Sequence, residues 1–417
     1  MPDAWERERP QPVAVGPPRR RLSRAQRMRE ARRRRRRRIV RSVTLCVFIL
    51  IVVGAVFLGS RLWHTVFGGP GSDYSGDGKS DVVIQVHDGD STTAIGKTLE
   101  EHEVVATSKA FVAAAQGNSA IQSIQPGFYK MRTEIPAASA VARLADPANR
   151  VGKLVIPEGR QLDDIRDVKT NAVTEGIFTL ISNATCVDLD GDRHCVSADD
   201  LRAAAGSASL SDLAVPVWAT APVQAMGNDH RRLEGLIAPG AWDVDPSASP
   251  KDILAQLIDG SADQYAQGGL LDTAKAMNMS PYQILTVASL VQREAKPQDF
   301  DKVARVIYNR LVAPDHSRLE FDSTVNYSLD RQEVATTDAD RARPTPWNTY
   351  VRQGLPATPI CSPGGPALAA AEHPADGDWL YFVTIDMQGT TLFTRDYPQH
   401  LANIELAKRN GVLDSAR

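Results

Sequence analysis

The sequence has almost no net charge: its 417 residues carry a formal charge of only −2 at pH 7. This balance hides an asymmetry, because residues 1–41 hold a net charge of about +12 and the remaining residues therefore about −14. An acidic folded part argues against nucleic-acid binding as its role, since nucleic-acid-binding domains present basic surfaces. The arginine run at residues 32–38 could bind phosphate by itself, but the segment that follows it favours another explanation.

Charged residues are absent from residues 42–60, SVTLCVFILIVVGAVFLGS. About nineteen uncharged, mostly apolar residues are enough to span a bilayer as a helix. Because the arginines precede this segment, the positive-inside rule predicts that residues 1–41 form a disordered basic tail in the cytoplasm. A cleaved signal peptide is the alternative, but the apolar core is long and no clear small-x-small cleavage site follows Leu58. The sequence therefore predicts a single-pass protein of the plasma membrane with an extracytoplasmic folded part.

Cysteine is scarce, with four residues, and the acidic loop between two of them lacks the pattern of a calcium site. Cys186 and Cys195 bracket this loop, and a disulfide between them is plausible in an exported domain. Counted from Asp188, the loop has glycine at the fourth place and no glutamate at the twelfth, so it does not match a calcium-binding loop. We therefore expect no bound metal and no cofactor.

Composition divides the rest of the chain into three regions. Residues 61–80 are rich in glycine and serine and predict a flexible linker. Residues 81–150 alternate between strand and helix patterns, which predicts a small α+β domain. This domain has no cluster of reactive side chains, so we expect it to bind or position rather than catalyse. Residues 151–417 predict a larger mixed α+β domain with an insertion at about 183–232.

Local signals in the larger domain predict several elements. A strand is predicted at KLVI before the turn PEG, helices at residues 161–168 and 252–268, and a β-hairpin at LYFVTIDMQGTTLFT. The irregular stretch PTPWNTYVRQGLPATPICSPG is rich in aromatic and hydrogen-bonding groups. It could form the wall of a saccharide-binding groove, and a rigid surface loop is an equally open alternative.

The clearest helix signals surround residues 281–296. Ser280 can cap a helix, Pro281 suits its first position, and Pro297 prevents much continuation. Apolar residues recur at helical spacing between these signals, and Glu294 shares their face. A second helix is predicted in DFDKVARVIYNRLV, followed by a polar loop, RLEFDSTVNY.

Glu294 ends this apolar stripe and is therefore the candidate general acid. Loss of solvation disfavours a charged carboxylate and raises its pKa, which suits a general acid near neutral pH. The alternative is a structural ion pair with a residue such as Arg310, and helical periodicity alone favours that alternative.

Several motifs in one order resemble the catalytic domain of MltG-type endolytic murein transglycosylases, the YceG-like family. These motifs are ASLVQRE, VARVIYNRL, RLEFDSTVNY, PWNTYVRQGLP, PICSPG, LYFV and the late His400. Upstream, HDGDSTTAIGKTL, QPGFYKM, IPEGR and LEGLIAPGAW are similar to the family's LysM-like domain and the start of its catalytic region. The resemblance runs from about Asp81 to the end, and it implies a LysM-like domain at 81–150 and a transglycosylase domain at 151–417.

The resemblance implies lytic cleavage of the β-1,4 bond between N-acetylmuramic acid and N-acetylglucosamine in nascent peptidoglycan strands. Such cleavage leaves 1,6-anhydromuramoyl ends and would terminate strand elongation. The family's catalytic acid matches Glu294. Its loops suggest a supporting set of substrate-binding residues: Asp322, Thr324, Asn326, Asn348 and Tyr350. Penicillin-binding synthases are candidate partners.

Two other functions stay open at this point, a hydrolytic muramidase and a non-catalytic wall-binding scaffold that recruits synthases. The chain also departs from the family pattern at three places. Gln292 stands where an acid is common, Glu320 where glutamine is usual, and PGAW at residues 239–242 where the family has a PDTY-like turn. The first change leaves Glu294 without a rival in its helix, and the other two concern the shape of the groove.

Overall fold

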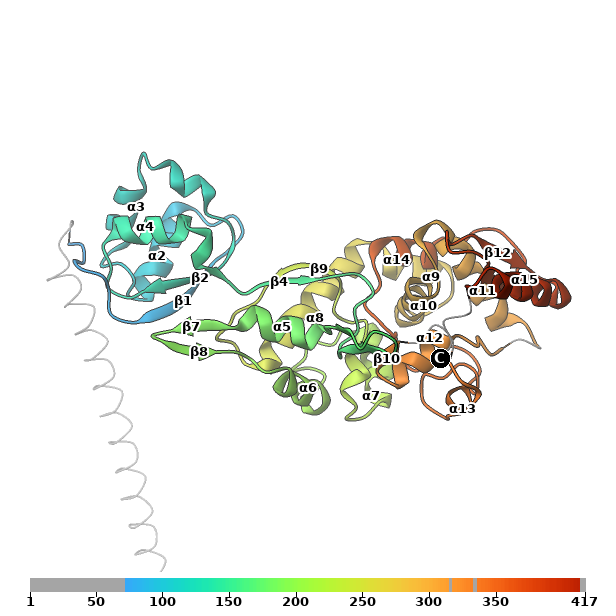
Figure 1. Cartoon of the computed structure of the whole chain (residues 1–417). Coiled ribbons are helices and arrows are strands. Elements are labelled where there is room, and N and C mark those ends of the chain that lie inside the picture. The colour runs from blue at the N-terminus through green and yellow to red at the C-terminus, as the bar shows by residue number, and fades with distance from the viewer. Residues whose placement is uncertain (1–71, 315–316, 333–335, 413–417) are drawn as a thin grey trace, which may run out of the picture. The chain divides into compact units, whose positions relative to one another are not determined.

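The computed structural model describes residues 72–314, 317–332 and 336–412. The predicted basic tail, the apolar segment at 42–60 and most of the predicted linker lie outside the described residues. Within the described ranges, no helix combines the length and apolar character needed to cross a bilayer. The described chain is a mixed α+β protein (Figure 1), which confirms the predicted fold class at this level.

The small N-terminal domain is a three-stranded antiparallel sheet covered by helices. Its strands, in the order β1-β2-β3, are β1 (Asp81–Val86), β2 (Gly127–Arg132) and β3 (Arg150–Val151). Its helices are α2 (Thr92–Glu101), α3 (Ser108–Ala115) and α4 (Ala137–Ala145). Ser91 and Thr107 cap α2 and α3 by accepting a hydrogen bond from a backbone amide in the first turn. The strand–helix–helix–strand order agrees with the sequence pattern, and the LysM-like assignment stays a prediction.

Buried apolar side chains fill the space between this sheet and its helices. Ile84 and Met131 from the strands meet Leu99, Phe111 and Val141 from the three helices, and all five are almost completely buried. Their alternation along each strand and their helical spacing explain why the pattern was readable from the sequence.

The larger domain contains the remaining helices and short strands of the described ranges. Its strands are β4 (Lys153–Ile156), β5 (Ile165–Asp167), β6 (Val173–Thr174), β7 (Val187–Leu189), β8 (Asp192–His194), β9 (Gly240–Asp243), β10 (Arg331–Gln332), β11 (Tyr381–Thr384) and β12 (Thr391–Thr394). They form four small sheets: β4-β9, β10-β5-β6, β7-β8 and β11-β12. Its helices are α5 (Ile177–Thr185), α6 (Ala198–Ser207), α7 (Val217–Ala225), α8 (Pro250–Gln267), α9 (Leu270–Ala276), α10 (Pro281–Glu294), α11 (Phe300–Val312), α12 (Asp322–Ser328), α13 (Asp338–Arg341), α14 (Gly365–Glu372) and α15 (Tyr397–Arg409).

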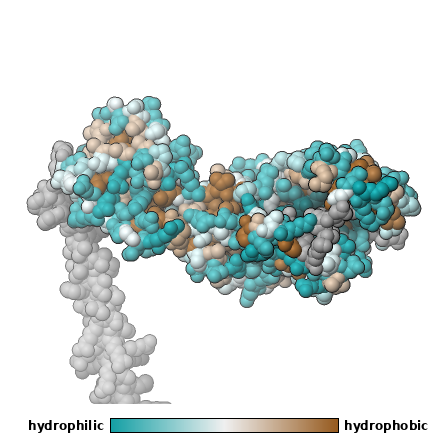
Figure 2. Space-filling model, viewed as in Figure 1, coloured by the Kyte–Doolittle hydropathy of each residue, from teal (hydrophilic) through white to brown (hydrophobic). Residues whose placement is uncertain are grey.

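Helix α10 lies at the centre of the larger domain. It packs against α7, α9, α11, α12 and α14, and Figure 1 shows it among α9, α11 and α14. Every residue from Tyr282 to Val291 is buried except the capping residue Gln283. The face visible in Figure 2 is mainly hydrophilic, with apolar residues in separate patches. The apolar face of α10 is therefore part of the core, and its C-terminal end, from Gln292 to Glu294, is partly exposed.

Two local predictions are wrong for the same reason. Residues 161–168 contain strand β5 rather than a helix, because Ile165 pairs with Thr174 and Arg166 pairs with Arg331 far along the chain. Most of RLEFDSTVNY is helix α12 rather than a loop, and it is held by contacts with a distant segment around Thr349. Contacts with segments distant in sequence stabilise both β5 and α12, and local propensity does not predict such contacts.

The region at 183–232, which the sequence suggests is an insertion, forms the β7-β8 hairpin, α6 and α7. Leu201, Leu213, Ala219 and Val223 from this region are fully buried in the main core. A disulfide joins Cys186 and Cys195 across the hairpin, as the loop between them suggested. The fourth cysteine, Cys361, is buried and free.

Candidate active site

Helix α10 begins and ends where the sequence signals predicted. The Ser280 hydroxyl accepts a hydrogen bond from the Gln283 amide at 3.1 Å, and the Gln283 side chain accepts one from the Ser280 amide at 2.9 Å. This reciprocal capping box and Pro281 fix the first turn. Glu294 is the last helical residue, since Ala295 is extended and Pro297 follows. The helix therefore delivers Glu294 from a rigid core to its own C-terminal end.

Burial and charge give Glu294 the properties of a general acid. The pKa of its carboxyl group is raised to about 7, chiefly because burial disfavours the charged form. The side chain and amide of Ser323, which lie beside the carboxyl group, lower this pKa, and the negative charge of Asp322 raises it. The nearby positive charge of Arg293 lowers it slightly. The burial effect prevails, so the Glu294 carboxyl can hold its proton near neutral pH.

Arg310 is not the partner of Glu294, and the structural ion pair considered from the sequence is wrong. The Arg310 Nη2 atom lies 2.6 Å from Glu320 Oε2, and its Nε donates a hydrogen bond to the Arg318 carbonyl at 3.0 Å. Glu294 therefore lacks the paired guanidinium of Arg310, which would have held it ionised.

Asp322, a predicted site residue, is a second carboxylate close to Glu294, but both of its oxygen atoms are occupied. Its Oδ1 accepts hydrogen bonds from Thr336 Oγ1 at 2.6 Å, Tyr350 Oη at 2.8 Å and Arg341 Nε at 3.1 Å. Its Oδ2 accepts from Arg341 Nη2 at 3.0 Å and from the Thr336 amide at 3.3 Å. Asp322 is therefore a fixed negative charge that influences Glu294, not a free nucleophile.

Tyr350, also predicted for the site, is partly buried and extends from the irregular segment to Asp322. Its hydroxyl donates the 2.8 Å hydrogen bond to Asp322, and the Arg341 guanidinium lies 5.0 Å from its ring centroid. Burial and the charge of Asp322 raise the pKa of Tyr350 far above its usual value, so the phenol stays protonated. Tyr350, Arg341 and Asp322 form one interlocked group beside the candidate acid.

The other three predicted site residues are buried. Thr324 is fully buried, donates a hydrogen bond to the Phe321 carbonyl and shares another with Thr349. Asn348 is 1% exposed and donates hydrogen bonds to the carbonyls of Arg341 and Arg343, and Asn326 is 7% exposed. Thr324 joins α12 to Thr349, and Asn348 holds the segment at 341–350 in shape through its own carbonyls, which positions the residues near Glu294.

Sequence reasoning missed Ser323, although it named the residues on both sides of it. Consecutive residues on a helix point about 100° apart, so Asp322, Ser323 and Thr324 cannot all face one ligand. Once DSTVNYS is known to be helical, Ser323 becomes the residue turned to Glu294, while Thr324 turns inward. Arg341 and Thr336 were also missed, because the contacts that bring them to Asp322 are not local in sequence.

Gln292, which replaces a common acid of the family pattern, joins α10 to two loops. Its Oε1 atom accepts a hydrogen bond from the Gly364 amide at 2.9 Å, and its side chain packs on Gly159. The two loops are joined to each other, since the Gly159 amide donates to the Ser362 carbonyl at 2.8 Å. A side chain at position 364 would meet the carboxyl end of the exposed Glu158 side chain, which would have to move away. Gln292 is therefore an anchor for the IPEGR turn and the CSPG loop.

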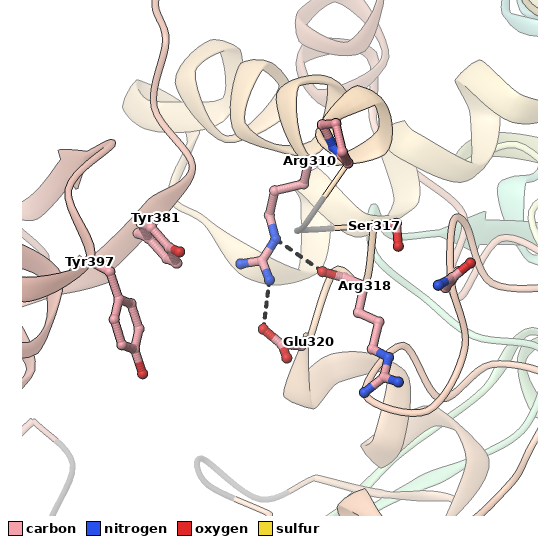
Figure 3. Close-up of a pocket in the computed structure, with 8 residues that line it drawn as sticks. Arg310, Ser317, Arg318, Glu320, Tyr381 and Tyr397 are labelled. Atoms are coloured by element: carbon pink, nitrogen blue, oxygen red, sulfur yellow. Dashed lines mark hydrogen bonds and ion pairs between the residues drawn. The ribbon is translucent and has the colours of Figure 1, made fainter.

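A polar cavity of about 500 Å³ lies beside Glu320, in the segment that precedes α12 (Figure 3). Arg310, Arg318 and Glu320 contribute to one side of it, and Tyr381 and Tyr397 to another. Within the described ranges, no group of three or more His, Cys, Asp or Glu side chains is placed to hold a metal ion.

A protonatable carboxyl group beside an immobilised carboxylate, on an α+β scaffold, defines a general acid–base site of the type used to cleave glycosidic bonds. The chain belongs to the YceG-like family, whose model matches residues 84–406. This membership confirms the resemblance seen in the ordered motifs.

Two named relatives and one crystal structure are similar to this chain. The chain is 26% identical over 357 residues to the endolytic murein transglycosylase of Bacillus subtilis (strain 168), an alignment that covers 84% of this chain and 89% of the other. It is 25% identical over 349 residues to the endolytic murein transglycosylase of Streptococcus pneumoniae (strain D39), covering 78% of this chain and 58% of the other. The crystal structure of a YceG-like protein from Listeria monocytogenes matches with a TM-score of 0.51 at 23% identity, covering 77% of this chain and 98% of that one, and shows the same fold.

Proposed function

We propose that this chain is an endolytic peptidoglycan transglycosylase that cleaves the bond between N-acetylmuramic acid and N-acetylglucosamine and forms 1,6-anhydromuramoyl ends. The observation that carries the proposal is the environment of Glu294, a carboxyl group with a pKa of about 7 and no cationic partner in its hydrogen-bonding shell. The named relatives supply the substrate class, since they are murein transglycosylases.

Glu294 acts twice in the proposed mechanism. Its protonated carboxyl donates the proton to the glycosidic oxygen while the bond from that oxygen to the muramoyl anomeric carbon breaks. The substrate's own C6 hydroxyl oxygen then bonds to the anomeric carbon, and its proton passes to the Glu294 carboxylate. The enzyme ends in its starting protonation state, and no water is consumed. Ser323 lies beside Glu294 and lowers its pKa, so it favours the charged form of Glu294 that follows proton donation.

A hydrolytic muramidase fits the site less well. Glycosidases generally use two carboxylates, the second as a nucleophile or as the base that activates water. Asp322 is the carboxylate in electrostatic contact with Glu294, and its oxygens already accept hydrogen bonds from Thr336, Arg341 and Tyr350. A reaction in which the substrate supplies the nucleophile needs only the acid that the site offers.

Purified protein acting on isolated peptidoglycan should release fragments that end in 1,6-anhydromuramic acid. The reason is that ring closure by the C6 hydroxyl replaces attack by water, so each anhydro product is one water, about 18 Da, lighter than its hydrolytic counterpart. Mass spectrometry of the soluble fragments measures the two kinds of end. Reducing muramoyl ends without anhydro products would reject the lytic mechanism and support the muramidase.

We further propose that residues 42–60 anchor the enzyme in the plasma membrane and that it acts on new strands, near penicillin-binding synthases, to terminate their elongation. The support is the uncharged segment behind sixteen arginines and the endolytic naming of the relatives. In intact cells, a membrane-impermeant thiol reagent should label a cysteine introduced at Ser72 but not one introduced at Ser23. Labelling of position 23 with protection of position 72 would reverse the proposed topology.

A further inference from the structure

The cavity in Figure 3 combines aromatic rings with charged groups, a combination typical of a saccharide-binding subsite. Tyr381 is held between two neighbours: its ring centroid lies 4.9 Å from that of His400, which stacks on it, and 5.4 Å from that of Tyr397. Tyr397 is 54% exposed. A sugar ring can therefore pack on the exposed Tyr397, whereas Tyr381 is 9% exposed and has His400 and Arg310 over its ring.

The two arginines of this cavity differ in what they already bind. Arg310 is buried, and its guanidinium is engaged by Glu320, by the Arg318 carbonyl and by the face of Tyr381 at 5.7 Å. Arg318 is exposed, and its guanidinium forms no ion pair within the described part of the chain. Figure 3 shows the Arg318 side chain directed away from Arg310. The cavity thus offers one free guanidinium, the group best suited to bind a carboxylate.

The cavity lies close to the candidate acid along the chain. Glu320 precedes Ser323 by three residues, which can separate them by no more than about 11 Å. Glu320 has a φ of +57°, a conformation that non-glycine residues seldom adopt, and its amide donates a hydrogen bond to the Thr349 carbonyl. This backbone is held by the same Thr349 segment that holds α12. A glycan strand bound at Glu294 therefore extends to the cavity.

We propose that this cavity binds a muramoyl residue that still carries its peptide stem, with the sugar against Tyr397 and a stem carboxylate paired with Arg318. The inference rests on the proposed function and adds a substrate specificity to it. The enzyme would prefer glycan strands with peptide stems over strands from which the stems have been removed, because the stem carboxylates project beyond the sugar, whereas stem removal leaves only the short lactyl carboxylate on the muramoyl ring.

The test uses two forms of one substrate, uncrosslinked glycan strands with their peptide stems and the same strands after an amidase has removed the stems. The Arg318→Gln variant should show a KM about tenfold higher on stem-bearing strands, the effect of losing one charge-assisted hydrogen bond, with kcat unchanged. On stripped strands, whose lactyl carboxylate stays against the sugar and does not extend to Arg318, it should match the unaltered protein. Arg193→Gln, the same change at an exposed position in β8, should leave both substrates unaffected.

Tyr397→Ala separates the sugar contact from the stem contact. It should raise KM on both forms of the substrate, because the ring packs on the sugar. Equal cleavage of both forms by the unaltered protein, or an equal loss on both forms in Arg318→Gln, would overturn the inference while leaving the proposed function intact. Failure of the unaltered protein to cleave either form would overturn the proposed function, and this inference with it.

Discussion

Replacing Glu294 with glutamine should reduce cleavage of glycan strands by about 10³-fold or more while leaving strand binding intact. Glutamine keeps the size and shape of the side chain but cannot give a proton to the glycosidic oxygen or take one from the C6 hydroxyl. General acid–base catalysis by one group is worth about 10²–10⁴-fold, and Glu294 serves in both steps. Release of anhydromuramoyl products per unit time measures the loss, and co-sedimentation with insoluble peptidoglycan measures binding.

Glu405→Gln is the matched control, since Glu405 lies on the exposed side of α15, paired with Lys408. It should cleave as the unaltered protein does. Full activity of Glu294→Gln would contradict the assignment and support the non-catalytic scaffold, in which the titratable proton has no role.

The Glu294→Gln variant should also differ from the unaltered protein in how its stability depends on pH, a difference that a misfolded protein would not show. Because the pKa of Glu294 is raised from its ordinary 4.5 to about 7, the folded protein binds this proton more tightly than the unfolded chain does. The unaltered protein therefore loses stability as pH rises between these two values, whereas glutamine removes the loss. At pH 8, Glu294→Gln should be more stable by about 1–2 kcal/mol, discounted because the carboxyl is partly exposed, and at pH 4 it should not be.

The parts of this site that the sequence revealed are those set by local rules. A serine cap, a proline at the first turn and an apolar stripe with helical spacing located α10, and the stripe's register placed Glu294 at its end. The same register left the role of Glu294 open, because an acid at a helix end can also be a structural ion pair. The position of Arg310 distinguishes these two roles of Glu294, because the Arg310 guanidinium pairs with Glu320.

The parts that the sequence did not reveal depend on contacts between distant segments. Asp322 meets Arg341 and Tyr350, nineteen and twenty-eight residues further on, and this meeting turns it from a ligand candidate into a fixed charge. A loop at DSTVNYS would allow Thr324 to face the groove, but this segment is helix α12. The helix places Thr324 inside, against Thr349, and turns Ser323 toward Glu294. Family resemblance locates such a segment, but it does not tell which of its side chains face the substrate.

The pH dependence of cleavage tests the physical basis of the site more directly than any single loss of activity. Free enzyme must hold the Glu294 proton before it can donate it, so kcat/KM should be level below about pH 7 and fall tenfold for each pH unit above it. An ordinary exposed glutamate would place this fall near pH 4 to 5. A fall at that lower pH would show that burial does not raise the pKa of Glu294 in solution.

Two variants should move this fall in opposite directions, which a general loss of structure cannot do. Asp322→Asn removes the like charge that raises the pKa of Glu294, so the fall should shift to lower pH. Arg293→Gln removes a positive charge that lowers this pKa, so the fall should shift to higher pH. Asp322→Asn also weakens the contacts with Arg341 and Tyr350, and it should therefore lower kcat at every pH. A shift in the same direction for both variants would mean that another group sets the profile, and that Glu294 is not the proton donor.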